Sequence, residues 1–123
     1  MSHRTTRDQY GQLVSALAAQ VLRHALEAHR QRQCIRTAPF TRALARDAYL
    51  REILAAKALC QSLRNNLHPA DWRAVFAGLR QLYRARLATE READAAVTQT
   101  RMANLLESER RAIHGFGALC RAA

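Results

Sequence analysis

A chain of 123 residues is the size of one domain, and its 49% hydrophobic content argues against a disordered chain. With 4 glycines and 2 prolines it lacks the frequent turn signals of an all-β fold, and no apolar run approaches the roughly 20 residues of a membrane-spanning helix. The net charge of +10 would attract a polyanion, namely RNA, DNA, an anionic membrane surface or an acidic protein. We expect a single all-α domain over residues 1–123, an antiparallel bundle of three long helices with an extended C-terminal helix. A break near Thr89 would make a fourth helix.

The first helix is expected over residues 6–32. Apolar side chains recur there at the spacing of one helix face: Tyr10, Leu13, Val14, Leu17, Val21 and Ala25. The helix is expected to end in the basic, polar run at 30–33, because Pro39 prevents it from continuing much further.

The second helix is expected over residues 40–65. An apolar seam with alternating steps of four and three residues runs along it: Tyr49, Ile53, Ala56, Cys60, Leu63 and Leu67. Further leucines widen the apolar face, so we expect this helix to contact more than one neighbour: Leu44, Leu50, Leu54 and Leu59. The run of Asn65 and Asn66 followed by His68 and Pro69 predicts a break after the helix.

The third helix is expected to begin near Pro69, which suits a first turn, with Asp71 favoured there by the helix dipole. It carries the richest aromatic stripe of the chain: Trp72, Val75, Phe76, Leu79, Leu82, Tyr83 and Leu87. Two alternatives stay open for residues 69–113. They form one helix of about 45 residues, or the chain breaks near Thr89.

In the second alternative Thr89 and Glu92 would form a capping box that opens a fourth helix. Gly115 and Gly117 are expected to end the last helix in either case, leaving Phe116 beyond it.

The sequence contains no motif for catalysis, metal binding or phosphate binding. His24 and His29 lie on different faces of a helix, and we expect surface or boundary positions for them. Cys34, Cys60 and Cys120 are too widely spaced for a zinc site, and Cys60 is expected in the core. We therefore expect a protein that is not an enzyme and holds no metal or cofactor of its own. A catalytic triad assembled from distant residues stays open.

The N-terminal residues combine arginines and hydroxyl groups with few acids, ahead of an amphipathic helix, which is typical of mitochondrial targeting segments. An odd number of scattered cysteines favours a reducing compartment. The expected location is the mitochondrial matrix or inner-membrane surface, with the cytoplasm as the alternative.

The tripeptide Leu82-Tyr83-Arg84 resembles the motif of the mitochondrial LYR-motif proteins, a family of small, basic, three-helix proteins. Val21-Leu22-Arg23 followed by Leu26 is similar to a degenerate copy of the motif on the first helix, where the family keeps it. Arg46-Asp47-Ala48-Tyr49 resembles the arginine-plus-aromatic signature of the family's second helix. The exact tripeptide departs from the family's pattern because it falls on the third helix.

The resemblance implies an assembly factor or accessory subunit of a respiratory complex, ATP synthase or the iron–sulfur machinery. It also implies binding to an acidic acyl carrier protein, whose acyl-phosphopantetheine chain would enter the helical core. The plain alternative for the tripeptide is that Arg84 is a solvated helix residue beside the core positions Leu82 and Tyr83.

The leading hypothesis is a non-enzymatic helical accessory subunit or assembly factor of a larger, mitochondrial respiratory-chain or ATP synthase complex. Its partners would be other protein subunits, an acidic acyl carrier protein or anionic lipid headgroups, bound through apolar helix faces and arginines. The residues expected to bind partners are Arg23 and Arg84 by charge, and Trp72, Phe76 and Tyr83 by packing.

The alternative is a basic RNA- or DNA-binding helical protein, associated with ribosomes or with a mobile element. It is less favoured because base stacking needs exposed aromatic rings, whereas the aromatic residues mostly lie on apolar stripes and are expected in the core: Tyr10, Phe40, Tyr49, Trp72, Phe76, Tyr83 and Phe116.

Overall fold

The computed structural model describes residues 3–92 and 95–119, which form four α-helices and one short 3₁₀ turn. The elements are α1 (His3–Thr37), the 3₁₀ turn η1 (Pro39–Thr41), α2 (Arg42–Asn66), α3 (Pro69–Glu90) and α4 (Ala95–Leu119). The expected all-α bundle is confirmed, and of the two alternatives for residues 69–113 the structure has the one with a break.

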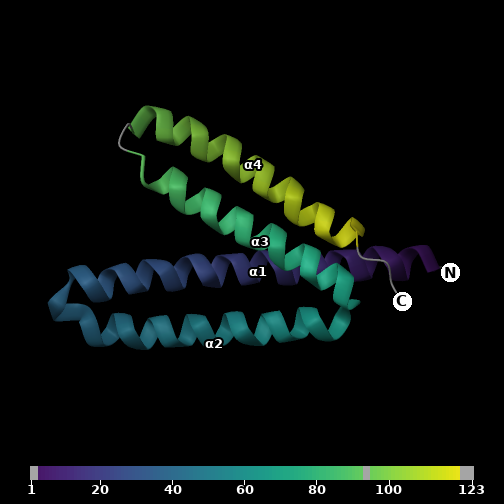
Figure 1. The fold of residues 1–123 in the computed structure, drawn as a ribbon, viewed down its shortest axis with the longest axis horizontal. Helices are drawn as coiled ribbons and strands as arrows, with labels where there is room; N and C mark the ends of the chain where they lie inside the picture. Colours follow the sequence, from purple (N-terminus) through teal and green to yellow (C-terminus); the bar gives the residue numbers. More distant parts are fainter. Residues whose placement is uncertain (1–2, 93–94, 120–123) are drawn as a thin grey trace.

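The helices form two antiparallel hairpins that cross at an angle (Figure 1). α1 and α2 lie side by side, and the α3–α4 hairpin lies obliquely across α1. The hairpins meet at the end where α2 turns into α3, and they diverge toward the turn between α1 and α2. The α1–α2 turn therefore extends beyond the helices of the second hairpin.

The helix α1 continues five residues past its expected end, because the basic, polar run at 30–33 does not end it and residues 33–37 stay helical. It stops at Ala38, which precedes Pro39 and has a non-helical backbone, with φ −127° and ψ 84°. A proline disfavours helical backbone at the residue before it, so Pro39 ends the helix directly rather than from a distance.

The break between α2 and α3 lies where the sequence predicts it. The His68 ring nitrogen Nδ1 accepts a hydrogen bond from the Ala70 N–H at 3.2 Å, and Pro69 occupies the first turn of α3. The turn is short, and Leu67 inside it is buried, so it fixes the second hairpin against the first at this end.

The break between α3 and α4 follows Glu90, but the expected capping box is absent from it. Thr89 lies in the last turn of α3, where its hydroxyl donates to the carbonyl of Ala85 at 3.0 Å. The N–H of Arg91 donates to the carbonyl of Ala88 and closes that turn. Thr89 therefore ends α3 and does not open α4.

The expectation that glycines end the last helix is wrong, because α4 continues through Gly115 and Gly117 to Leu119. Gly117 instead lets α4 cross α1 closely: a Cβ atom there would come within 2.1 Å of the Gly11 carbonyl oxygen. Phe116 is buried, and its ring covers Gly78 of α3, where a Cβ would lie 2.6 Å from the ring.

The core lies along α1, which contacts each of the other three helices, and α2 contributes to it from its C-terminal half. Its buried side chains come from every helix: Val14, Ala18, Val21, Leu22, Leu26, Leu63, Leu67, Val75, Leu79 and Phe116. In the N-terminal half of α2 only Ala45 is buried, because the second hairpin has diverged there. That half of α2 packs on α1 alone and leaves its outer side exposed.

Candidate functional site

The turn between α1 and α2 carries four arginines and an exposed phenylalanine. Arg32 and Arg36 are one helical turn apart near the end of α1, and Arg42 and Arg46 are one turn apart at the start of α2. Phe40 lies between the two pairs, in η1. We call these five residues the basic tip.

The arginines of the basic tip have no acidic partner among the residues that the structure describes. Among the side chains that the structure describes, every ion pair is formed by other groups, and none of the four tip arginines takes part. The start of α2 adds to the positive potential, because its first turn holds no acid and Thr41 makes no side-chain capping hydrogen bond. The tip thus presents uncompensated positive charge.

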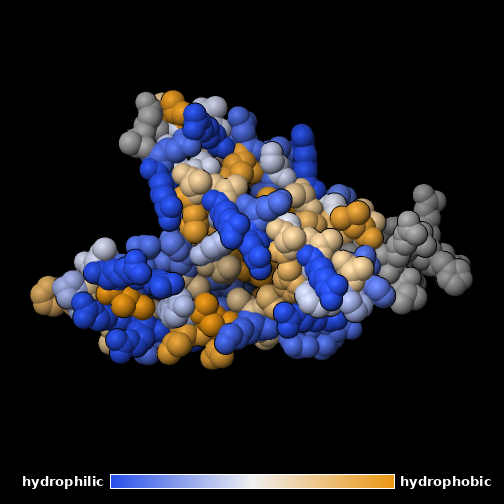
Figure 2. Space-filling model, viewed as in Figure 1, coloured by the Kyte–Doolittle hydropathy of each residue, from blue (hydrophilic) through white to orange (hydrophobic). Residues whose placement is uncertain are grey.

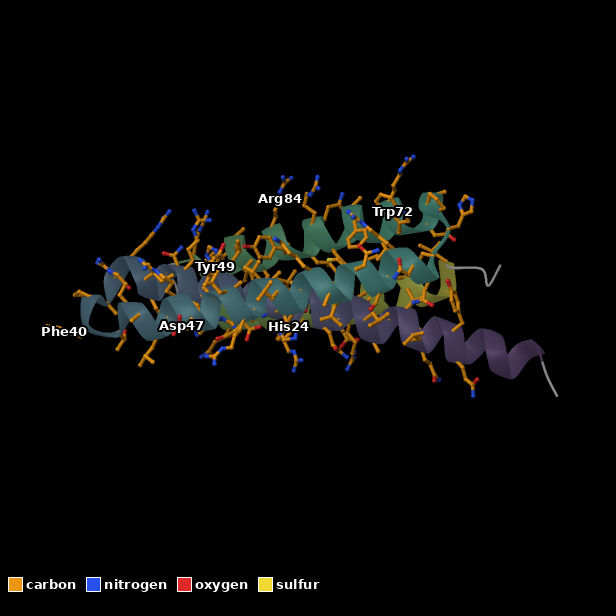
Figure 3. All side chains as sticks on the ribbon, turned by 90° about the horizontal axis from the view of Figure 1, so that it is seen from below. His24, Phe40, Asp47, Tyr49, Trp72 and Arg84 are labelled. Atoms are coloured by element: carbon orange, nitrogen blue, oxygen red, sulfur yellow. The ribbon has the colours of Figure 1, made fainter. Side chains whose placement is uncertain are left out.

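Phe40 is fully exposed, at 102% of its reference area, which contradicts its expected place in the core. The cause is its position: Figure 3 shows Phe40 at the free end of the hairpin, and neither α3 nor α4 reaches that end. The sequence pattern could not show this, because an apolar residue next to a turn looks the same whether or not another helix covers it.

Trp72 and Phe76, two of the expected partner-binding residues, are half-buried and serve the joint between α2 and α3. Their rings pack edge to face with centroids 5.8 Å apart. The guanidinium of Arg64, from α2, lies 5.0 Å from the Trp72 ring and 5.7 Å from the Phe76 ring. These cation–π contacts hold the end of α2 against the start of α3.

Tyr83 and Arg84 have different surroundings although they are adjacent. Tyr83 packs against the core and makes an edge-to-face contact with His29 of α1, with ring centroids 6.3 Å apart. Arg84 is exposed, and its side chain projects away from the other helices in Figure 3. Arg84 is thus a solvated arginine next to Leu82 and Tyr83, which pack against the core.

Arg23, the remaining expected partner-binding residue, is exposed on α1 at a small hollow of about 140 Å³ that it lines with Arg86 and Glu109. No described contact joins Arg23 to Arg84 or to Trp72. The five expected residues therefore do not form one site, and the basic tip is a surface that the sequence analysis did not single out.

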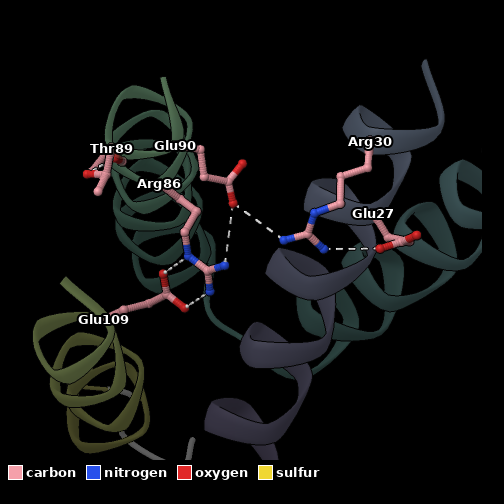
Figure 4. A network of polar contacts seen from close by, with 7 residues as sticks. Glu27, Arg30, Arg86, Thr89, Glu90 and Glu109 are labelled. Carbon is pink, nitrogen blue, oxygen red and sulfur yellow. Dashed lines mark hydrogen bonds and ion pairs between the residues drawn. The ribbon is translucent and has the colours of Figure 1, made fainter. Parts of the chain in front are cut away.

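Ion pairs tie α1, α3 and α4 together on the side of the Arg23 hollow (Figure 4). Glu109 of α4 accepts two hydrogen bonds from Arg86 of α3, at 2.9 and 3.2 Å, and Arg30 of α1 reaches Glu90 of α3 at 3.4 Å. These pairs join residues 23 and 60 positions apart, so spacing in the sequence gave no signal for them.

One carboxylate and one guanidinium group of this network, those of Glu27 and Arg30, have shifted pKa values. The pKa of Glu27 is lowered by hydrogen bonds from Gln31 and Arg30, and the pKa of Arg30 is raised by its hydrogen bond to Glu27. Both shifts favour the charged forms, and their largest causes lie within α1.

The described part of the chain holds no group of three histidine, cysteine or acidic side chains that could bind a metal ion. None of its helices combines the length and the apolar character needed to cross a bilayer. Of the cysteines, Cys34 is exposed, and Cys60 is half-buried in a place where burial raises the pKa of its thiol. Cys120 lies outside the described residues.

Comparison of the chain with protein-family models, curated proteins and solved structures finds no match. The resemblance to LYR-motif proteins, the mitochondrial location and the acyl carrier partner stay predictions from the sequence.

Proposed function

We propose that this protein is a non-enzymatic helical accessory subunit or assembly factor that docks onto an acidic surface of a partner protein through its basic tip. The observation that carries the proposal is the tip itself, where four arginines that form no ion pair with any described residue flank a fully exposed phenylalanine. The acyl carrier protein implied by the sequence resemblance belongs to this class of acidic partners.

The chemistry of the tip suits a protein interface. An arginine guanidinium pairs with a carboxylate through two parallel hydrogen bonds and is readily accommodated at an interface. Aromatic and arginine side chains are enriched among the residues that dominate binding energy, and Phe40 would supply the apolar anchor among the charges. Pairing with acidic groups would also relieve the repulsion among the four arginines.

Nucleic-acid binding is the second candidate function, and the exposed ring of Phe40 between arginines favours it. Proteins that bind single strands usually combine a positive groove with several stacking rings. The tip is the convex end of a two-helix hairpin with one exposed ring (Figure 3), which fits a protein contact better.

The test compares three forms of the tagged full chain, purified from the cells that express it and followed by mass analysis of the bound material. The tip variant combines Arg36→Glu, Arg42→Glu and Arg46→Glu. The control variant combines Arg80→Glu, Arg84→Glu and Arg91→Glu, which removes the same charge from exposed positions on α3 and at its C-terminal end, and leaves Arg73 in its cation–π contact with Trp72. The control variant also tests whether Arg84 binds a partner by its charge, as the sequence predicts.

We expect an acidic protein to co-purify with the wild type and with the control variant after nuclease treatment, and to be lost from the tip variant. Loss from the control variant alone would contradict the assignment to the tip. Bound RNA or DNA that disappears on nuclease treatment, without an acidic protein, would establish the second candidate instead.

A further inference from the structure

The outer side of α2 exposes three leucines that no described helix of the chain covers. The exposed fractions are 73% for Leu44, 51% for Leu50 and 65% for Leu54. Figure 1 shows α2 at one edge of the molecule, and Figure 2 shows hydrophobic groups along that edge. Asp47 and Arg51 are exposed on the same side and form no ion pair among the described residues. We call these five residues the leucine face.

The spacing of the leucine face is that of a helix-pairing seam. Positions 44, 47, 51 and 54 follow one another at steps of three, four and three residues, the spacing of the contact line between two coiled helices, with leucines at its two ends and the charged Asp47 and Arg51 in the middle. The exposed side of α2 is therefore shaped to receive another helix lying along it.

The charges on the face select the direction of that helix if it comes from a second copy of the chain. Parallel pairing would set Asp47 against Asp47 and Arg51 against Arg51. Antiparallel pairing, with the two-fold axis between these positions, sets Asp47 of each copy against Arg51 of the other. Both groups, which form no ion pair with any described residue of the single chain, then gain a partner.

The same register also matches the leucines. Moving outward from the axis, Leu44 of each copy comes opposite Leu54 of the other, and Leu50 lies beside the axis near its own counterpart. A hollow of about 370 Å³ beside Leu44, lined by Asp47 and Arg51 among others, gives room for the incoming Leu54 side chain. In this one arrangement each leucine of the face gains an apolar neighbour, and Asp47 and Arg51 each gain an opposite charge.

We propose that the chain forms an antiparallel homodimer through the leucine face of α2, held by leucine packing and two reciprocal Asp47–Arg51 ion pairs. An anionic lipid surface would suit the face less well, because it would repel the carboxylate of Asp47 at its centre. The inference goes beyond the proposed function. Antiparallel pairing would point the two basic tips in opposite directions, ready for two acidic partners.

The test is sedimentation equilibrium of the full chain over a concentration series at fixed ionic strength. We expect a concentration-dependent dimer. Asp47→Arg and Arg51→Asp each set like charges opposite one another and should each weaken the dimer by about tenfold or more. The double variant D47R/R51D exchanges the two charges and should return the dissociation constant to within about threefold of the wild type.

The design separates pairing from net charge. Arg51→Asp lowers the positive charge of each chain, so a purely repulsive effect would strengthen its dimer, whereas the proposal expects a weaker one. Circular dichroism checks that every variant keeps its helices. A chain that stays monomeric, single reversals without effect, or a double variant without recovery would each overturn the proposal, and none of these outcomes bears on the basic tip.

Discussion

At the scale of single residues, three glycines decide how closely the helices approach. Gly11 and Gly117 meet where α1 and α4 cross, and Gly78 accommodates the ring of Phe116. None of the glycines has a positive φ, so their role is space and not backbone freedom. Glycine in a helix interior costs roughly 0.5–1 kcal/mol relative to alanine, and close packing here offsets that cost.

The crossing predicts opposite effects for two neighbouring substitutions. Gly117→Ala puts a methyl group 2.1 Å from the Gly11 carbonyl oxygen, so α1 and α4 must separate, at an expected cost of at least about 2 kcal/mol. Gly115→Ala meets nothing within 4 Å and should stabilise the fold by roughly 0.5–1 kcal/mol. Urea unfolding of both variants measures the difference, and equal effects would refute the close crossing.

The two described cysteines should differ in reactivity. The thiolate is the reactive form, and burial raises the pKa of Cys60, so iodoacetamide should modify Cys60 more slowly than the exposed Cys34 at neutral pH. Because the fold prefers the neutral Cys60 thiol, its contribution to stability is present at low pH and is lost as pH rises through the raised pKa. Peptide-resolved mass analysis over a pH series gives both rates. Equal rates in the folded protein would contradict the burial, and unfolding in urea should equalise them.

Residue-level prediction from the sequence succeeded where local pattern decides and failed where a distant element decides. Pro69 and Asp71 were placed correctly in the first turn of α3, because helix starts have local chemistry. Gly117 and Phe40 were misjudged for one reason. Whether a glycine admits another helix, or an aromatic ring is covered, depends on the crossing of the two hairpins.

At the scale of helices, the pair between Arg86 and Glu109 joins α3 to α4. Glu109 is among the buried residues, and its two hydrogen bonds from Arg86 fix the relative position of the two helices. The break between these helices was one of two alternatives in the sequence, since no glycine or proline lies near it. The contact between Arg86 and Glu109, which pairs α3 with α4, cannot be recognised from the sequence and is seen only in the structure.

Removing one member of this pair should destabilise the fold. Glu109→Gln leaves the charge of Arg86 without its main partner, and we expect a loss of about 2 kcal/mol, below the roughly 3–5 kcal/mol of a fully buried pair. Glu107→Gln is the matched control, because Glu107 pairs with Arg111 at 3.3 Å on the exposed side of α4. Its effect should stay within about 0.5 kcal/mol. Similar losses in thermal unfolding of both variants would show that the Arg86 pair has no special role.

At the scale of the whole molecule, the crossing of the two hairpins places the contacts that stabilise the fold at one end and the exposed candidate binding surfaces at the other. The core and the cation–π contacts lie where the hairpins meet, and the exposed phenylalanine and the leucine face lie toward the end where they diverge. Periodicity predicted the helices and the wide apolar face of the second helix, for which more than one neighbour was expected, yet Leu44, Leu50 and Leu54 are exposed. It could not predict which end of the bundle stays open, because apolar spacing does not specify which helix covers which stripe.

The measurement that tests the central claim most directly is site-specific photo-crosslinking in the cells that express the protein. A photoreactive phenylalanine analogue replaces Phe40 in one form of the full chain and Gln81, an exposed residue of α3, in the other. We predict a crosslink to an acidic protein from position 40 and none from position 81. Crosslinks from position 40 only to nucleic acid, or to the same protein equally from both positions, would contradict docking through the basic tip.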